Sequence, residues 1–119
     1  MRVLLVDDEE DLVATLAERL SFRGIEADYA LDSDGAMEKI LAGCYDVAVL
    51  DVVMPGLGGI RLKKLLETKC PDMKFLFLTG HGSESEFESG AAEAGQEYYL
   101  IKPVPLQKLI DKMNEALNQ

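Results

Sequence analysis

The hydrophobic positions of this chain alternate between two spacings, a continuous run and a helical repeat. Val3–Val6 is a continuous apolar run, and apolar residues then recur every three or four positions from Leu12 to Leu20, before Gly24. A continuous run is typical of a strand buried on both faces, and the wider repeat is typical of an amphipathic helix. Glycine is common just beyond the end of a helix. The N-terminal part of the chain therefore predicts a buried strand followed by a helix.

The same succession of strand and helix is repeated four more times. We expect the later strands at Ile25–Ala30, Asp46–Asp51, Lys74–Thr79 and Glu97–Lys102. The first of these alternates apolar and polar residues, as a half-exposed edge strand does. We expect the later helices from Ser33 (the predicted N-cap) to near Gly43, from Gly59 to Thr68, from Glu84 to Ala94, and from Pro105 onward. The inner faces of the second and last helices are predicted to consist of Ala36, Met37, Ile40 and Leu41, and of Leu106, Leu109, Ile110, Met113 and Leu117.

Five strand–helix repeats define a fold class. Consecutive parallel strands need long, usually helical crossovers, and these crossovers are right-handed. The chain is therefore predicted to form an α/β domain with a doubly wound, five-stranded parallel sheet and helices on both faces. Folds of this class bind ligands at the carboxyl ends of their strands, so functional residues are expected at that edge.

Charged and hydroxyl side chains stand at four of these carboxyl ends. Asp7 and Asp8 follow the first strand, Asp51 ends the third, Thr79 ends the fourth, and Lys102 ends the fifth. Crowded carboxylates repel one another, and a hard cation such as Mg2+ relieves the repulsion. A carboxylate at the end of a buried strand, as Asp51 is, can accept a phosphoryl group as an aspartyl phosphate. Lys102 and Thr79 would stabilise the charge that develops on the phosphoryl oxygens.

Each of these residues also has a purely structural explanation. Acids such as Asp7 and Asp8 are favourable at a helix N-terminus. Thr79 is a good strand former, and the pair Lys102–Pro103 can simply end a strand. The coincidence of all of them at one predicted sheet edge favours a functional site.

Composition and charge set further limits. A chain of 119 residues with 48% hydrophobic residues is expected to form one domain. Its formal net charge of −10 disfavours direct binding to nucleic acid, and no apolar run in the sequence is long enough to span a membrane. The N-terminus turns acidic after four apolar residues, unlike a signal peptide, so we expect a cytoplasmic protein.

The histidine and the cysteines exclude some chemistries. The single histidine, His81, excludes a multi-histidine metal site. It is expected on an exposed loop at the rim of the site, where it could affect the access of water to Asp51. Cys44 and Cys70 are far apart in the sequence and match neither a CxxC redox pair nor a zinc pattern, so we expect two reduced thiols.

Four segments together resemble the receiver domain of two-component response regulators: LLVDDEE, VLDVVMPGLGG, LFLTGHG and YYLIKP. The resemblance covers nearly the whole chain and has the motifs in the family's order. It implies a flavodoxin-like (βα)5 fold with strand order 2-1-3-4-5. It also implies that Asp51 is the phosphoacceptor, and that Asp7, Asp8 and the backbone carbonyl of Val53 hold Mg2+ (or Mn2+) together with Asp51.

The resemblance further implies a conformational switch. Thr79 and Lys102 correspond to the residues that contact the phosphoryl oxygens, with a cis peptide bond after Lys102. Tyr99 corresponds to the switch aromatic, which turns inward behind Thr79 on phosphorylation and changes the face of the fourth helix, fifth strand and fifth helix. The sequence does not separate the face of Tyr99 from that of Tyr98. Gly58 departs from the pattern, because many family members have an aspartate there that caps the third helix.

The predicted function is a phosphorylation-controlled signalling switch rather than a turnover enzyme. The expected phosphodonor is a histidine kinase or a histidine phosphotransfer protein. Residues 1–119 are expected to be one receiver domain without an output domain, either monomeric or weakly dimeric after phosphorylation.

Two alternatives stay open. A Mg2+-dependent phosphohydrolase with an aspartyl-phosphate intermediate would usually carry a second aspartate where this chain has Val53. A receiver-like module could instead bind a protein partner without phosphorylation. The sequence indicates neither the cognate kinase, nor the output, nor the lifetime of the phosphorylated state.

Overall fold

The computed structural model describes residues 1–54, 56–80 and 98–118. Five parallel strands form one sheet in the order β2-β1-β3-β4-β5. The strands are β1 (Arg2–Val6), β2 (Glu26–Ala30), β3 (Val47–Asp51), β4 (Lys74–Thr79) and β5 (Tyr99–Ile101). The strand order confirms the predicted flavodoxin-like topology, with β2 at one edge of the sheet, as its alternating pattern predicts.

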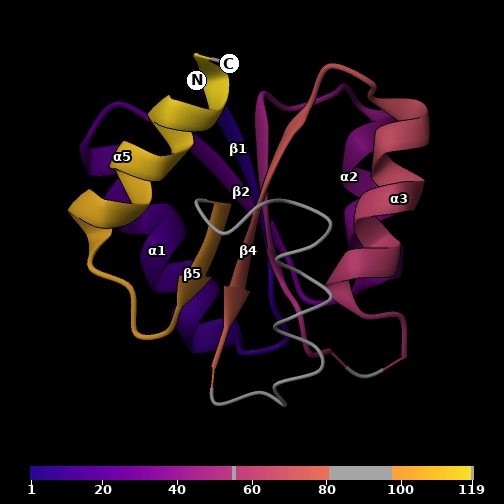
Figure 1. The fold of residues 1–119 in the computed structure, drawn as a ribbon, viewed down its shortest axis with the longest axis horizontal. Helices are drawn as coiled ribbons and strands as arrows, with labels where there is room; N and C mark the ends of the chain where they lie inside the picture. Colours follow the sequence, from indigo (N-terminus) through magenta and orange to yellow (C-terminus); the bar gives the residue numbers. More distant parts are fainter. Residues whose placement is uncertain (55, 81–97, 119) are drawn as a thin grey trace.

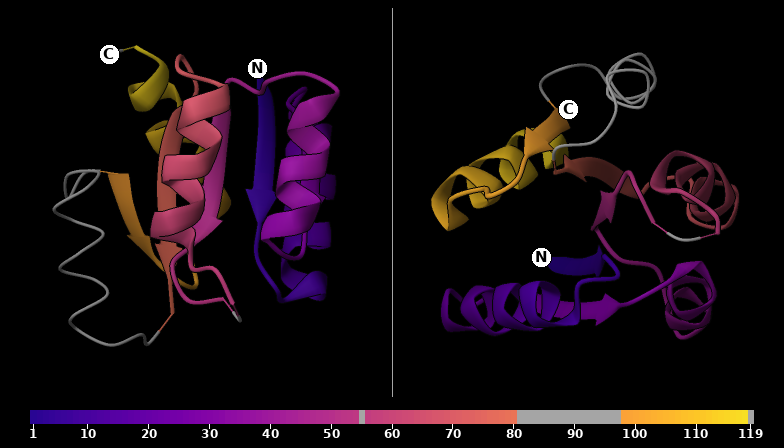
Figure 2. Two further views of the ribbon diagram at one scale, coloured as in Figure 1. Left: turned by 90° about the vertical axis from the view of Figure 1, so that its right-hand side faces the viewer. Right: turned by 90° about the horizontal axis from the view of Figure 1, so that it is seen from below.

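Helices cover both faces of the sheet (Figure 1). They are α1 (Glu10–Phe22), α2 (Ser33–Leu41), α3 (Gly59–Lys69) and α5 (Leu106–Leu117). Seen from below, the sheet separates α1 and α5 from α2 and α3 (Figure 2). The predicted helix at Glu84–Ala94, as well as His81 and Pro55, lies outside the described residues.

Two hydrophobic clusters hold the layers together, one on each face of the sheet. In β1, Leu4 and Val6 face the cluster under α2 and α3, whereas Val3 and Leu5 face the cluster under α1 and α5. All five residues of β3 are buried. Successive side chains of a strand point to opposite faces, so a strand covered on both sides needs a continuous apolar run. This requirement is the physical reason for the runs in the sequence.

Two expectations for α2 were wrong. The N-cap is Asp32 rather than Ser33, because the Asp32 carboxylate accepts a hydrogen bond from the Gly35 N–H at 2.7 Å. Aspartate and serine are similarly favoured at this position, so the sequence could not choose between adjacent candidates. Leu41 was expected on the inner face but is 78% exposed, since it is the last residue of the helix and points away from Ala36 and Ile40.

The expectation of two reduced thiols was also wrong. Cys44 and Cys70 form a disulfide, with their Cα atoms 5.9 Å apart and a sequence separation of 26. Cys44 lies in the loop before β3, and Cys70 is the C-cap of α3, shortly before β4. Because β3 and β4 are neighbours, the residues before them meet at the same edge of the sheet. Sequence spacing alone does not reveal this proximity.

Candidate functional site

The carboxyl edge of the sheet brings together the polar residues that the strand ends predict. Asp7 follows β1, Asp51 and Thr79 are the last residues of β3 and β4, and Lys102 follows β5. Three of these side chains are buried or nearly so: Asp7 is 1%, Asp51 4% and Thr79 4% exposed. Burial of two carboxylates in one place is costly without compensation, so their surroundings require an explanation.

Asp7, Asp8 and Asp51 form a compact acidic cluster. Each offers a carboxylate oxygen, and these oxygens all lie within 4.8 Å of one another. Asp8 is exposed, so the cluster is open to solvent on one side. The Asp7 Oδ1 atom accepts a hydrogen bond from the Glu9 N–H at 2.9 Å, and the Asp51 Oδ1 atom accepts one from the Val53 N–H at 3.2 Å. These backbone bonds orient both carboxylates toward a common point.

Lys102 supplies the opposing charge. Its Nζ atom lies 2.5 Å from Asp7 Oδ2, 3.5 Å from Asp51 Oδ2 and 3.4 Å from Glu9 Oε1. The Lys102 side chain is 13% exposed and those of Asp7 and Asp51 are buried, so these two ion pairs are largely shielded from water, whereas the Glu9 side chain is 64% exposed. The peptide bond between Lys102 and Pro103 is cis, as the resemblance implies. Glu9 was missed by the sequence reasoning, although it belongs to the acidic DDEE run that the first motif contains.

Burial and charge perturb the acid–base behaviour of this site. The pKa of Asp51 is raised from 3.8 to about 6. Burial is the largest cause and the nearby Asp7 charge also raises the pKa, whereas Lys102 and the Val53 N–H lower it. Burial by itself lowers the pKa of the Lys102 amine, but contact with Asp7 and the charges of Asp51 and Glu9 outweigh it, so the net shift is upward. The negative charge of Asp51 is therefore only partly compensated, whereas the lysine stays charged.

The Asp51 shift predicts a pH-dependent cost in stability. Because the pKa of Asp51 is higher in the folded state than its ordinary value, protonated Asp51 stabilises the folded state. This contribution to the free energy of unfolding is fully present below pH 4 and is lost as the pH rises through 6. In a chelator, Asp51→Asn should therefore match the wild type near pH 4 and become more stable by about 2 kcal/mol at pH 8. Urea unfolding across this pH range measures the difference.

Asp8→Asn is the matched control, because it removes one carboxylate from the same cluster at an exposed position. Its stability relative to the wild type should change less between pH 4 and pH 8. A difference between wild type and Asp51→Asn that does not vary with pH would contradict the prediction.

The turn after β3 brings the start of α3 against Asp51. Gly58 is the N-cap of α3 and has no capping side chain, in keeping with the departure from the family pattern. The Gly59 N–H donates to the Val52 carbonyl at 3.2 Å. A Cβ atom on Gly59 would lie within contact distance of the Asp51 backbone, 2.2 Å from its carbonyl oxygen. Glycine is therefore required there for close approach.

Thr79 and Tyr99 lie on the same face of adjacent strands. In the register of β4 and β5, Phe77 is opposite Tyr99 and Thr79 is opposite Ile101. Tyr99 is 6% exposed, and its ring centroid lies 6.0 Å from that of Phe77. Tyr98 packs against the other cluster, so the structure separates the two tyrosines that the sequence could not. The Thr79 hydroxyl donates to the Gly80 carbonyl at 3.3 Å.

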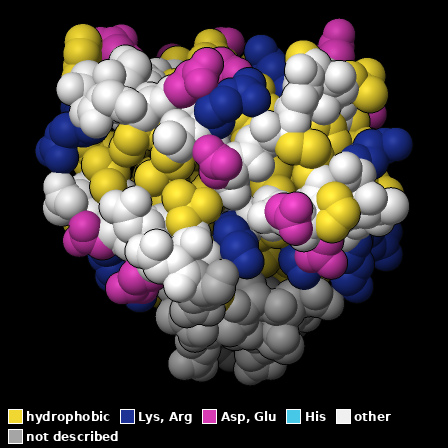
Figure 3. Space-filling view, turned by 90° about the horizontal axis from the view of Figure 1, so that it is seen from above, with side chains coloured by type: hydrophobic (Ala, Val, Ile, Leu, Met, Phe, Trp, Pro, Cys, Tyr) yellow, Lys and Arg dark blue, Asp and Glu magenta, His cyan; other side chains and the backbone are white. Residues whose placement is uncertain are grey.

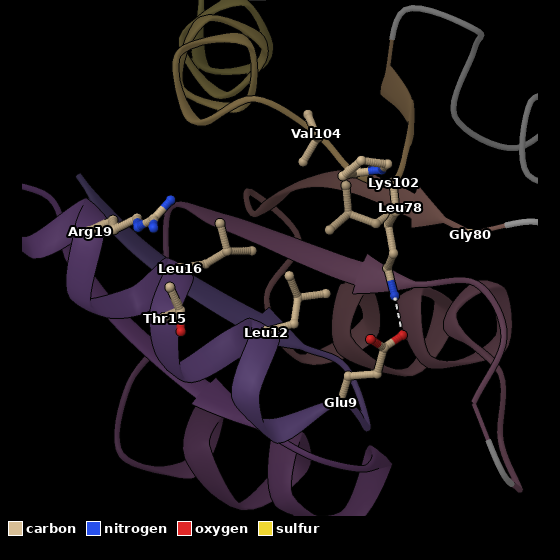
Figure 4. Close-up of a pocket in the computed structure, with 10 residues that line it drawn as sticks. Glu9, Leu12, Thr15, Leu16, Arg19, Leu78, Gly80, Lys102 and Val104 are labelled. Carbon is tan, nitrogen blue, oxygen red and sulfur yellow. Dashed lines mark hydrogen bonds and ion pairs between the residues drawn. The ribbon is translucent and has the colours of Figure 1, made fainter.

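A pocket of about 600 Å³ adjoins the lysine between α1 and the segment after β5 (Figure 4). Its walls include Leu12 and Leu16 of α1 together with Leu78 and Val104, and Glu9 faces Lys102 at one end while Arg19 lies at the other. The site is therefore approachable from the side of α1.

The donor set fits a hard divalent cation. Mg2+ binds oxygen ligands, usually one or two carboxylates with water, and retains positions for phosphate oxygen. Asp7, Asp8 and Asp51 offer such oxygens on one open side, where a cation would offset the charge that Lys102 leaves uncompensated. The orientation of the Val53 carbonyl toward a metal stays a prediction.

The chain thus has a doubly wound parallel sheet with clustered acids, a hydroxyl and a lysine at its carboxyl edge. Comparison with known families agrees, since residues 3–114 match the response regulator receiver domain. This chain belongs to that family of two-component signalling domains.

Relatives of known sequence and structure support the assignment. The chain is 36% identical over all 119 residues to the response regulator MprA of Mycobacterium avium, of which it spans 52%, about half the length. A response regulator receiver domain protein from Clostridium thermocellum superposes with a TM-score of 0.85 at 30% identity, covering 98% of this chain and 94% of the other. A CheY-like receiver domain protein from Methanospirillum hungatei gives 0.86 at 28% identity, covering 98% and 93%. Among the described residues, no helix has the length and apolar character needed to cross a membrane.

Proposed function

We propose that this domain is a phosphorylation-dependent switch in which Asp51 accepts a phosphoryl group from a phosphohistidine of a histidine kinase or phosphotransfer protein. The observation that carries the proposal is the convergence of Asp7, Asp8 and Asp51 with Lys102 at one partly open edge of the sheet. A structural ion-pair network would need neither three acids nor an open side. The proposed setting of this exchange is the cytoplasm.

The chemistry follows from the positions of these side chains. A carboxylate oxygen of Asp51 attacks phosphorus, the P–N bond of the phosphohistidine breaks, and its electron pair returns to the imidazole nitrogen. Lys102, whose Nζ lies 3.5 Å from Asp51 Oδ2, is placed to stabilise negative charge on the transferred group. Asp7 and Asp8 would hold Mg2+, which would neutralise charge on the phosphoryl oxygens. Water then hydrolyses the acyl phosphate to inorganic phosphate and restores the Asp51 carboxylate, so the phosphorylated state ends without a second protein.

The proposed readout passes through Thr79 and Tyr99. A phosphoryl group on Asp51 would offer oxygens to the Thr79 hydroxyl in place of its present bond to the Gly80 carbonyl. Tyr99 shares the face of Thr79 and already lies buried against Phe77. Movement of Thr79 would therefore change the packing behind Tyr99 and the surface that includes β5 and α5, which an output domain or downstream protein would recognise.

Intact mass after incubation with acetyl phosphate and Mg2+ tests the phosphoacceptor. The wild type should gain one phosphoryl group, and the adduct should be absent without Mg2+ and absent in Asp51→Asn. Asp72→Asn, a substitution at an exposed turn, is the matched control and should be phosphorylated like the wild type.

Two other results would replace the proposal. Failure of the wild type both to form the adduct and to bind Mg2+ would favour a phosphorylation-independent binding module. Steady turnover of a small phosphate ester, abolished by Asp51→Ala, would favour a phosphohydrolase.

A further inference from the structure

The disulfide encloses the part of the chain that carries the phosphoacceptor. The residues between Cys44 and Cys70 include all of β3, Asp51 and all of α3. The bond lies at the amino edge of the sheet, whereas Asp51 lies at the carboxyl edge. We call residues 44–70 the Asp51 unit, because this segment connects the disulfide with Asp51. Figure 3 looks onto this amino edge, where hydrophobic surface is interspersed with charged side chains of both signs.

The two sulfurs differ in their access to solvent. Cys44 is exposed, whereas Cys70 is 3% exposed and belongs to the hydrophobic cluster under α2 and α3. A thiolate attacks a disulfide only at a sulfur that it can reach. An incoming reductant would therefore attack Cys44, and Cys70 would be the leaving group.

The fold can accommodate the reduced pair as well as the disulfide. A buried cysteine thiol behaves as a small hydrophobic group, so Cys70 can remain in its cluster. The Cys44 Sγ atom lies 3.9 Å from the Lys69 carbonyl oxygen. A disulfide sulfur has no proton to donate, but the Cys44 thiol formed by reduction would have an acceptor there. The surroundings of Cys44 and Cys70 are therefore compatible with both the disulfide and the two thiols.

We propose that Cys44 and Cys70 form a reversible thiol–disulfide site that takes a dithiol as its reductant. One thiolate of the dithiol attacks Cys44 Sγ, the Cys44–Cys70 bond breaks, and Cys70 leaves as a thiolate that is then protonated. The second thiolate of the dithiol attacks its own sulfur in the mixed disulfide and releases Cys44. The protein disulfide gains two electrons and two protons, and the dithiol becomes a disulfide.

This site regulates the mobility of the unit that carries Asp51. The disulfide ties the start of β3 to the end of α3, while backbone hydrogen bonds from Val52 to Leu78 and from Gly59 to Val52 hold the other end of the unit. Reduction removes the covalent constraint and leaves these bonds in place, so the last turn of α3 should open more often. The link to signalling rests on the proposed function of Asp51; the redox chemistry does not. In the cytoplasm, which is the setting proposed above, disulfides are usually redox-sensing or catalytic rather than permanent.

Reduction of the folded protein tests the redox site without phosphate or Mg2+. The oxidised full chain is treated with dithiothreitol under native conditions and freed of the reductant, and its far-UV circular dichroism is recorded. It is then alkylated with iodoacetamide in denaturant, so that the buried Cys70 also reacts, and weighed intact. Two alkyl groups should appear with the far-UV circular dichroism unchanged, and oxidised dithiothreitol should restore the bond in an unalkylated sample. The double variant Cys44→Ser/Cys70→Ser controls for the reagents and should show no change.

Single variants test the direction of attack. The Cys70→Ser variant keeps only the exposed thiol of Cys44, and the Cys44→Ser variant keeps only the buried thiol of Cys70. We expect Cys70→Ser to form a mixed disulfide with glutathione disulfide about tenfold faster than Cys44→Ser. Amide hydrogen exchange should be about tenfold faster in the last turn of α3 after reduction, with β1 unchanged.

Three results would overturn the proposal. The bond could resist dithiothreitol until denaturant is added, the reduced chain could lose its circular dichroism signal, or exchange in α3 could be the same in both states. Resistance to dithiothreitol or loss of the circular dichroism signal would make the bond a permanent structural disulfide. Unchanged exchange in α3 would mean that the bond does not affect the mobility of the Asp51 unit. None of these measurements depends on phosphorylation, so they can fail while the phosphoacceptor test succeeds.

Discussion

Replacing Lys102 with methionine is expected to destabilise the domain by about 3 kcal/mol when a chelator removes divalent cations. The Lys102 amine lies 2.5 Å from Asp7 Oδ2 and 3.5 Å from Asp51 Oδ2, and both carboxylates are nearly inaccessible to water. Removing one partner of a buried ion pair leaves its charge uncompensated, and that desolvation cost exceeds the value of the pair itself. Urea unfolding at pH 7.5 measures the loss.

Magnesium distinguishes this effect from simple loss of packing. If the acidic cluster binds a cation, millimolar Mg2+ should stabilise Lys102→Met more than the wild type, because the cation replaces the missing positive charge. Lys112→Met is the matched control, since Lys112 pairs with Glu115 at 3.0 Å on the surface of α5. Exposed pairs contribute less than about 1 kcal/mol, so this variant should be nearly neutral. Equal losses in the two variants would refute the assigned role of Lys102.

The substitution Gly59→Ala is expected to cost about 3 kcal/mol and to slow phosphorylation of Asp51. The new methyl carbon would lie 2.2 Å from the Asp51 carbonyl oxygen and 3.0 Å from its carbonyl carbon. Both are backbone atoms, so the clash is relieved only by moving α3 or the end of β3. Either movement displaces Asp51 from Asp7 and Lys102. Urea unfolding and the rate of the acetyl phosphate adduct measure the two effects.

Gly80→Ala separates this clash from the general effect of replacing glycine. A Cβ atom on Gly80 would meet no atom within 4 Å. Its stability should therefore be unchanged or slightly higher, because alanine restricts the unfolded chain more than glycine does. If Gly59→Ala is as stable as Gly80→Ala, the contact between α3 and Asp51 is looser than the structure indicates.

The strands and the composition of the site were predictable because their signals are local. A strand covered on both faces must be apolar throughout, so Val47 to Leu50 was recognisable without any knowledge of its neighbours. Parallel strands carry their carboxyl ends to one edge, so Asp7, Asp51 and Lys102 were expected together. The family resemblance added roles to these residues and the cis bond after Lys102, which the structure contains.

Other features depend on distances that no local pattern encodes. Glu9 joins Lys102 only because the loops after β1 and β5 approach one another across 93 positions of the chain. The Asp32 cap was decided by which of two adjacent polar side chains reached the Gly35 N–H. The outward position of Leu41 follows from where α2 ends rather than from its hydrophobicity.

The sequence by itself determined the order of strands and helices, the edge at which polar residues gather, and the kinds of side chain found there. These follow from the periodicities of buried strands and amphipathic helices, which are properties of neighbouring residues. Only the tertiary structure decided that Cys44 and Cys70 are bonded, that Lys102 lies closer to Asp7 than to Asp51, and that α3 touches the Asp51 backbone at Gly59. Each of these is a contact between segments that packing alone brings together.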